Sequence, residues 1–300
     1  MWVDEPWYAS TAYNFLQGKG MVDVVGQSNW ISLYPMLMSG FFMIFGATLF
    51  SARLFSILGG LIALVGFILI LKNFQIKEKY LCWGALIFIF SNVNYIIFRT
   101  VRPEGWTVTF IVWGLYFLIQ ALQKNKLIHY FFSGFMITSA FLCHPNAALY
   151  IFGFALVVLI FALHKKKHSN FLAFLLGSGI IILALFSIII FVKNQNLFDF
   201  FGRWLHRTSV KGAGITPIFQ NFYSFYKSYT LGFKRLFIFI FEIGVLILGL
   251  SFFKRNKYIF IISSLGLGYF ILAIFFLKPF ATRHFAEILI FSFIAFVLIL

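Results

Sequence analysis

The stretch LFSILGGLIALVGFILIL, residues 54–71, decides the fold. It contains no charged side chain. A helix that crosses the hydrocarbon core of a bilayer needs about 20 apolar residues at a rise of about 1.5 Å each. A membrane β-barrel would require alternating apolar and polar positions, which this solid apolar block lacks. The segment therefore predicts a transmembrane helix.

Similar apolar segments recur along the whole chain, in which 62% of 300 residues are hydrophobic and 11% are charged. This composition excludes a soluble globule, because too few polar side chains remain to cover its surface. We predict one all-α domain over residues 1–300, a polytopic transmembrane helix bundle of about nine spans plus interfacial helices. The candidate segments are 33–50, 54–71, 80–98, 105–122, 127–142, 147–163, 171–192, 233–253, 258–277 and 285–300.

The formal charge of +16 is concentrated in alternate short connections between these segments. No RNA-binding signature or zinc-ligand set accompanies it, so no nucleic-acid partner is expected. Short basic loops face the cytoplasm in membrane proteins, and the sequence therefore predicts that side for four connections. Their basic residues are Lys72, Lys77, Lys79, Lys124, Lys126, Lys165, Lys166, Lys167, Lys254, Arg255 and Lys257.

The remaining loops should face the extracytoplasmic side of a multi-pass protein of a cell membrane, such as a bacterial inner membrane. They comprise residues 1–50, expected to hold interfacial helices, and the short loops at 99–104, 144–146 and 278–284. A long connection at 193–232 is also expected on this side, although it carries excess positive charge. Asp4 and Glu5 lie on the same side of the membrane as Glu104 only if the chain between them crosses the membrane an even number of times. We therefore expect segment 33–50, which contains Pro35 and two glycines, to lie at the interface or to re-enter.

The two cysteines and the two chain ends carry little chemical information. Cys82 and Cys143 lie in or beside apolar segments, which is atypical of a disulfide framework. No signal peptide precedes Asp4, and the chain stops within an apolar run at Leu300. We expect truncation at both ends.

Paired acids open the chain in WVDEPWYA, where Asp4 and Glu5 precede a short helix expected near residues 7–16. A carboxylate at a membrane surface is costly unless it is used or solvated. It could accept the proton of an attacking hydroxyl or amine as a general base. The alternative is that either acid only caps the helix, because acids favour helix N-termini.

A second charged group, FRTVRPEGW, contains Arg99, Arg102 and Glu104. A guanidinium forms charge-assisted, often bidentate, hydrogen bonds to phosphate. Arg102 could hold a lipid phosphate at the bilayer surface. The alternative is an internal pair between Arg102 and Glu104, or snorkelling of the arginine to the interface.

Further basic residues lie in the second half of the chain. Four basic residues lie in the stretch FGRWLHRTSVKGAG, namely Arg203, His206, Arg207 and Lys211. They could form a specific site for the headgroup of an anionic lipid, or they could attract anionic lipids in general. Arg283 and His284 open the last segment, where Arg283 could pair with Glu287 one turn later. His144, before Pro145, is either part of the site or a polar loop residue.

The order of these features resembles that of GT-C-type glycosyltransferases of the protein O-mannosyltransferase superfamily, including the bacterial aminoarabinose transferases. The resemblance covers roughly the first 150 residues. It rests on five features in order, which are DEPWYA at 4–9, Tyr34–Pro35, SARLFSILGG at 51–60, RPEGW at 102–106 and the stretch from Gly134 to His144. Walker, dinucleotide-binding and zinc-protease motifs are absent from the sequence. The sequence departs from the family pattern by lacking a helix before DEPWYA, by Glu104 in place of Asp, and by His144 in place of Lys.

The resemblance implies a polyprenyl-phosphate-sugar donor and a protein, lipid or glycan acceptor. It implies Asp4 as catalytic base, Glu5 as its partner, Glu104 as the second acid, and Arg53 as a structural or site-ordering residue. Direct displacement would invert the anomeric carbon. Nothing in the spacing of the carboxylates demands a metal, although a divalent ion remains open.

Two alternatives stay open. A transporter or lipid flippase could use a cavity lined by these basic residues without catalysing a reaction. Paired repeats and broken helices at mid-membrane, which are frequent in transporters, are not evident in the sequence. The chain could also be a noncatalytic truncated relative.

Overall fold

The computed structural model describes residues 5–21, 33–187, 233–276 and 286–299. These residues form helices joined by short turns, with no strand in the described ranges. The α-helices are α1 (Glu5–Leu16), α2 (Leu33–Phe45), α3 (Leu49–Asn73), α4 (Glu78–Phe90), α5 (Asn92–Arg99), α6 (Pro103–Lys124), α7 (Leu127–Cys143), α8 (Ala148–His164), α9 (His168–Ser187), α12 (Phe233–Leu250), α13 (Lys257–Phe276) and α14 (Ala286–Ile299). Two 3₁₀ turns are η1 (Pro145–Ala147) and η3 (Ser251–Lys254).

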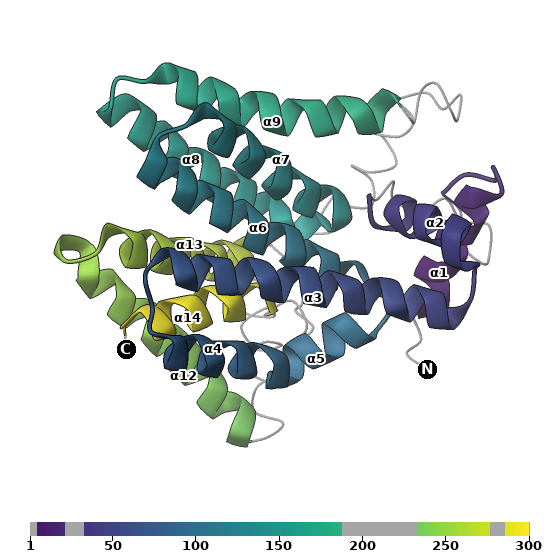
Figure 1. Cartoon of the computed structure of the whole chain (residues 1–300), viewed down its shortest axis with the longest axis horizontal. Helices are drawn as coiled ribbons and strands as arrows, with labels where there is room; N and C mark the ends of the chain where they lie inside the picture. Colours follow the sequence, from purple (N-terminus) through teal and green to yellow (C-terminus); the bar gives the residue numbers. More distant parts are fainter. Residues whose placement is uncertain (1–4, 22–32, 188–232, 277–285, 300) are drawn as a thin grey trace.

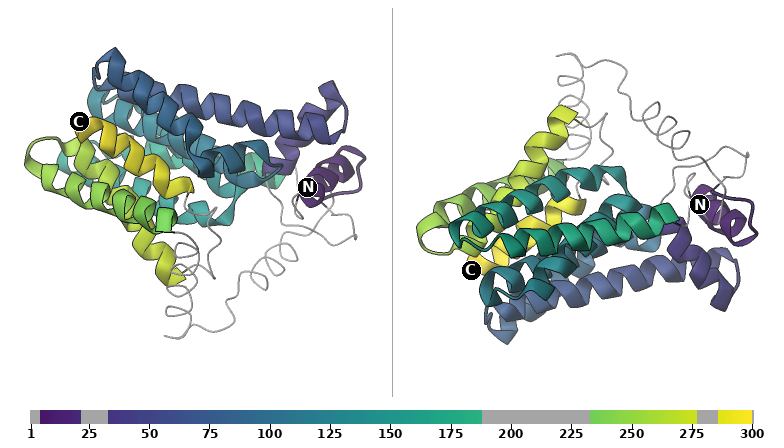
Figure 2. Two further views of the ribbon diagram at one scale, coloured as in Figure 1. Left: turned by 90° about the horizontal axis from the view of Figure 1, so that it is seen from below. Right: turned by 90° about the horizontal axis from the view of Figure 1, so that it is seen from above.

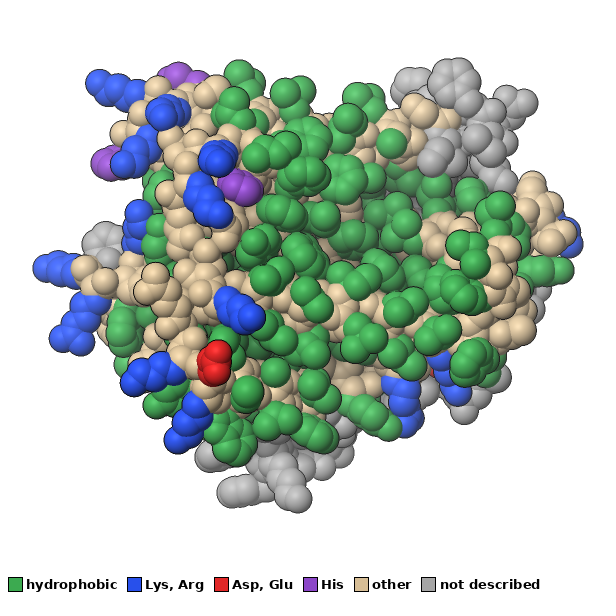
Figure 3. All heavy atoms as spheres, viewed as in Figure 1, with side chains coloured by type: hydrophobic (Ala, Val, Ile, Leu, Met, Phe, Trp, Pro, Cys, Tyr) green, Lys and Arg blue, Asp and Glu red, His purple; other side chains and the backbone are tan. Residues whose placement is uncertain are grey.

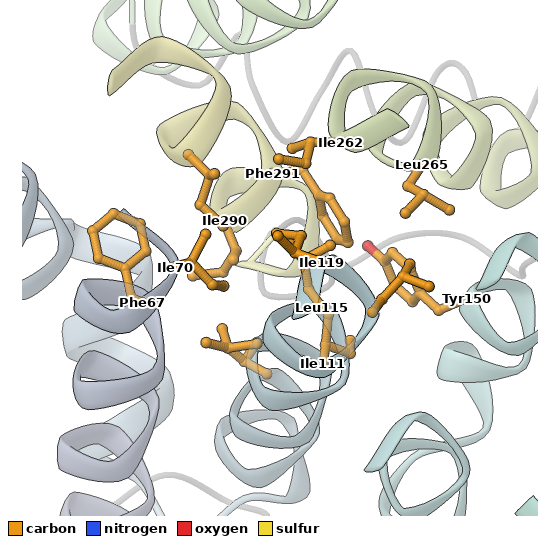
Figure 4. Packing of buried hydrophobic residues seen from close by; sticks show 14 of the residues in the cluster. Phe67, Ile70, Ile111, Leu115, Ile119, Tyr150, Ile262, Leu265, Ile290 and Phe291 are labelled. Carbon is orange, nitrogen blue, oxygen red and sulfur yellow. The ribbon is translucent and has the colours of Figure 1, made fainter. Parts of the chain in front are cut away.

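Helix α6 is the axis of the bundle, with α3 on one side, α7 on another, and α8 and α14 also in contact. Its buried side chains Ile111, Leu115 and Ile119 meet residues of α3, α8, α13 and α14, as Figure 4 shows. Among these are Tyr150 of α8 and Phe291 of α14, whose rings stack at 5.3 Å. The core is therefore apolar and lies around α6.

The first long helix begins at a well-defined N-cap. The Thr48 hydroxyl accepts a hydrogen bond from the Ser51 amide at 3.1 Å, and the Ser51 hydroxyl accepts one from the Thr48 amide at 3.0 Å, which is a capping box. Gly46, with a φ of 77°, turns the chain just before it. Segment 33–50 is therefore split, and α2, with 13 residues or about 20 Å, is too short to cross a bilayer. This agrees with the expectation that it does not span.

Helices α3 and α6 run parallel, and interhelical hydrogen bonds fix their register. Trp106 Nε1 donates to the Phe55 carbonyl at 3.2 Å near the start of both helices, and Gln120 Nε2 donates to Asn73 Oδ1 at 2.7 Å near their ends. Helices α4 and α5, which connect α3 to α6 in the chain, run in the opposite direction. The starts of α3 and α6 therefore lie at the same end of the bundle (Figure 1).

One predicted span is wrong as a continuous helix. Segment 80–98 breaks at Ser91 into α4 and α5. Asn94 Nδ2 donates to the Phe88 carbonyl at 2.9 Å, so a side chain replaces one of the helical hydrogen bonds lost at the break. The two short helices together make the return that one helix was expected to make.

The count of about nine spans is not confirmed. Within the described residues, four helices are long and apolar enough to cross a membrane, namely Leu49–Asn73, Pro103–Lys124, Pro145–His164 and His168–Ser187. Shorter apolar helices are Leu33–Phe45, Leu127–Cys143, Ile240–Leu250, Lys257–Leu272 and Ile290–Ile299.

Charge separates the two ends of the bundle. The turns that carry the predicted cytoplasmic lysines and arginines gather at the left edge in Figure 3. Helices α1 and α2 lie at the opposite end, as the two views of Figure 2 agree. The structure thus groups the basic turns as the alternation of charge predicts.

Helices α7 and α9 approach closely through two glycines. A Cβ on Gly134 would collide with the carbonyl oxygen of Phe174, and a Cβ on Gly177 with that of Phe131. Such small residues let helix backbones pack tightly in membranes. Gly179, on the same helix as Gly177, has nothing within 4 Å of the place where a Cβ would be.

We predict that Gly177→Ala lowers the free energy of unfolding by roughly 1 to 3 kcal/mol, because backbone must move to admit the methyl group. The matched control Gly179→Ala should be neutral or stabilising by up to about 1 kcal/mol, from helix propensity alone. Thermal unfolding of the purified variants in detergent measures both. Equal melting temperatures for the two variants would contradict the close crossing.

Candidate functional site

The first helical residue, Glu5, is fully buried and joins three segments of the chain. Its Oε2 accepts a hydrogen bond from Arg53 Nη2 at 2.8 Å, and its Oε1 accepts hydrogen bonds from Arg53 Nε and from the Val101 amide, each at 3.2 Å. Both carboxylate oxygens are therefore engaged. Glu5 ties the start of α1 to the first turns of α3 and to the residues that precede α6.

Arg53 holds Glu5 through a two-point contact, while 40% of its side chain is exposed. A guanidinium matches the two carboxylate oxygens with two of its N–H groups, which fixes orientation as well as distance. The buried carboxylate would be a costly isolated charge without this partner. Arg53 therefore has a structural contact with Glu5, and its role in a site stays a prediction.

Arg102 and Glu104 form a second pair at the start of α6. Arg102 is the N-cap residue, Pro103 follows at the first helical position, and Glu104 lies in the first turn, where the helix dipole favours an acid. Arg102 Nε lies 3.5 Å from Glu104 Oε2, and only 4% of the Arg102 side chain is exposed. The internal pair considered from the sequence is present, and the guanidinium lies beneath the surface.

An apolar and aromatic cluster packs around these pairs. The Trp106 ring stacks on Phe55 at 4.7 Å, and Gly59 leaves room for its indole. Tyr34 of α2 packs edge-on against Tyr8 of α1 at 5.9 Å. The buried members of this cluster are Ala12, Tyr34, Met38, Phe42, Ala52, Phe55, Val101 and Cys143.

Glu5 and Glu104 therefore lie at the same end of the bundle, as the parity of crossings predicts. Glu5 accepts a hydrogen bond from the amide of Val101. Residues 102–104, which include Arg102 and Glu104, follow Val101 directly in the chain. The sequence did not identify the backbone of Val101 as a partner, because a main-chain donor leaves no signal in residue type.

Two other predicted site residues have local partners. Arg99 is exposed on α5, donates to the Tyr95 hydroxyl at 2.6 Å and lies over its ring. His144 Nδ1 accepts from the Asn146 amide at 3.4 Å and so caps η1, next to Cys143 of the aromatic cluster. The structure thus gives both a structural contact, and their roles in a site stay predictions.

Several predicted residues lie outside the described ranges. They are Asp4, Arg203, His206, Arg207, Lys211, Arg283 and His284. Among the described residues, no group of three His, Cys, Asp or Glu side chains could hold a metal ion.

One buried acid was missed by the sequence analysis. Glu242 is 3% exposed on α12, a helix that packs against α13 and α14. A lone acid in an apolar run was the available signal, because intramembrane carboxylates are rare.

Comparison with known proteins agrees with the resemblance. The profile of a family described as "Dolichyl-phosphate-mannose-protein mannosyltransferase" matches residues 32–191, more than half of the chain. The match includes both arginines of the described ion pairs and Glu104, but not Glu5. No curated protein and no solved structure matches the chain. With its apolar helices and this match, the chain belongs to the dolichyl-phosphate-mannose-protein mannosyltransferase family, and is a multi-pass membrane protein of the GT-C glycosyltransferase type.

Proposed function

We propose that this protein transfers a sugar from a polyprenyl-phosphate carrier to a protein, lipid or glycan acceptor. The observation that carries the proposal is the bonding of Glu5 to Arg53 and Val101, which brings the N-terminal acidic stretch to the start of α6. The family description, which names a lipid-linked mannose donor and a protein acceptor, supports this class of reaction. The particular sugar and acceptor of this chain are not part of the proposal.

Asp4 is the proposed catalytic base. Both oxygens of the neighbouring Glu5 already accept hydrogen bonds, so Glu5 suits a positioning role. The adjacent carboxylate of Asp4 takes the proton from the acceptor hydroxyl or amine. Glu5 is thus a positioning residue in the proposed site.

The proposed reaction is a single inverting displacement. The acceptor oxygen or nitrogen forms a bond to the anomeric carbon as its proton passes to Asp4. The bond from that carbon to the phosphate oxygen breaks, and polyprenyl phosphate leaves with the electron pair. Arginines stabilise the charge that grows on the phosphate, usually the largest electrostatic contribution to such catalysis. The proposed phosphate-binding residues are Arg99, Arg102, Arg203, Arg207, Lys211 and Arg283.

The proposed site faces the extracytoplasmic side. The basic turns lie at the other end of the bundle, and short basic loops are retained in the cytoplasm. A lipid-linked donor with its headgroup outside the cytoplasm would then enter from the outer leaflet.

We predict that Asp4→Asn in the full-length protein lowers the transfer rate by about 10² to 10⁴, because a positioned base is lost. The melting temperature should stay unchanged. The assay follows radiolabelled sugar from the lipid carrier to the acceptor. Transfer at the wild-type rate would rule out Asp4 as the base, and no transfer by the wild-type protein with any polyprenyl-linked sugar would leave the transporter hypothesis.

Glu5 and Arg53 should show strong energetic coupling. Glu5→Gln and Arg53→Met should each lower the free energy of unfolding, because the first removes the buried carboxylate and the second leaves that carboxylate without its cation. The double variant should cost less than the sum, since the second substitution removes a partner already lost. The exposed control Arg99→Met should cost less than about 1 kcal/mol. Additive effects in chemical unfolding would contradict the pair.

The orientation can be tested by cysteine labelling. Cys82→Ser and Cys143→Ala remove the native thiols, and Lys19→Cys or Lys166→Cys then places one thiol at an exposed position at each end. A membrane-impermeant maleimide added to intact cells should label Lys19→Cys only, and Lys166→Cys should react only after the membrane is opened. The reverse pattern would place the proposed site in the cytoplasm.

A further inference from the structure

The basic end of the bundle carries a charge that the protein itself hardly neutralises. Eleven lysines and arginines from four turns are exposed there, with Glu78 as the only acid in those turns. We call this surface the basic face; Figure 3 shows its basic side chains along one edge. Like charges this close repel one another, so counter-ions must gather at this surface.

Contacts between the turns hold the basic face together. The Phe74 ring, after α3, lies 5.6 Å from the ring of Tyr258 on α13. Asn170 Nδ2, on α9, donates to Asn125 Oδ1 in the turn between α6 and α7 at 2.8 Å. The charges are therefore carried on turns fixed relative to one another.

Two basic turns meet where α8 ends and α13 begins. Lys257 Nζ lies 5.8 Å from the centre of the Phe161 ring. The Lys165 amide donates to the Phe161 carbonyl at 2.9 Å, so the Lys165–Lys167 turn begins one helical turn after the residue that Lys257 approaches. Lys257 also lies over its neighbour Tyr258 at 5.0 Å, and cation–π contacts restrain its position. We call Lys165–Lys167 together with Lys257 the α8–α13 seam.

An exposed apolar stripe leads away from the Lys165–Lys167 turn along α8, on a different face of the helix from Phe161. Phe152, Leu156 and Ile160 are spaced four residues apart and are 63%, 46% and 54% exposed, and Leu163 continues the stripe at 55%. Residues at this spacing share one face of a helix. The stripe runs from the charged turn into the membrane-spanning part of α8, where lipid chains lie.

We propose that the α8–α13 seam and the α8 stripe form a binding site for an anionic phospholipid of the cytoplasmic leaflet. The lysines take the headgroup phosphate and the stripe takes an acyl chain. A cluster of basic residues next to a transmembrane helix is a typical anionic lipid site. This site lies at the end opposite the proposed transferase site and needs no part of it.

The test titrates lipid into the purified full-length protein in dodecyl maltoside and records the melting temperature. Phosphatidylglycerol should raise it to a plateau, whereas phosphatidylcholine and inorganic phosphate should not. Each lysine removed should raise the half-saturating concentration roughly fivefold. The variant Lys165→Gln/Lys166→Gln/Lys167→Gln should therefore shift it on the order of a hundredfold, and high salt should weaken the wild-type response.

A matched control removes the same charge elsewhere on the basic face. Lys72→Gln/Lys77→Gln/Lys79→Gln should shift the half-saturating concentration clearly less than the seam variant does, because these lysines lie where α3 ends and α4 begins and not on α8, which carries the stripe. An equal loss in both triple variants would overturn the site in favour of diffuse attraction. An equal response to both phospholipids, or to phosphate alone, would also overturn it. Should the triple variant not fold, Lys257→Gln replaces it, with about a fivefold shift expected and an unchanged titration counting against the site.

Discussion

The burial of the Glu5 carboxylate is the constraint on which the functional end of the molecule depends. A charge with no exposed surface is tolerated only if its oxygens are satisfied, and here Arg53 and the Val101 amide satisfy them. Each partner comes from a different part of the chain. The N-terminal stretch is thereby attached to the bundle by a charged contact of fixed geometry, where α1 alone, a 12-residue helix, would hold it only by packing.

The helix arrangement makes that contact possible. Helices α3 and α6 are parallel, so the chain must return between them, and α4 with α5 makes the return in two pieces. As a result Arg53 in the first turn of α3 and Val101 just before α6 lie at one end. A continuous helix over 80–98 would give the same parity. At the break near Ser91, the polar side chain of Asn94 lies inside an apolar run. Its amide donates to the Phe88 carbonyl in place of a main-chain N–H.

Much of this arrangement could be predicted from the sequence, because the relevant signals are local. Apolar length identified most of the helices, alternation of charge grouped the basic turns, and the parity of crossings placed Glu5 on the same side as Glu104. The partners of individual side chains could not be predicted. Sequence order gives no reason for Glu5 to bond to Arg53 and Val101, and the pairing of Arg102 with Glu104 was one of several alternatives. Those choices depend on packing and on main-chain donors, which composition does not encode.

The two ends of the bundle solve different electrostatic problems. In the described part of the α1–α2 end, the buried acids Glu5 and Glu104 are each paired with an arginine, so their positions are fixed by partners within the chain. At the basic face, charges are many, exposed and nearly all of one sign, so their partners must come from outside. Buried, paired charges are preorganised, which is what chemistry on a leaving phosphate requires. Exposed like charges are adaptable, which suits headgroups that exchange with the bilayer. In the two proposals the same residue types serve catalysis at one end and lipid contact at the other, and burial distinguishes the two roles.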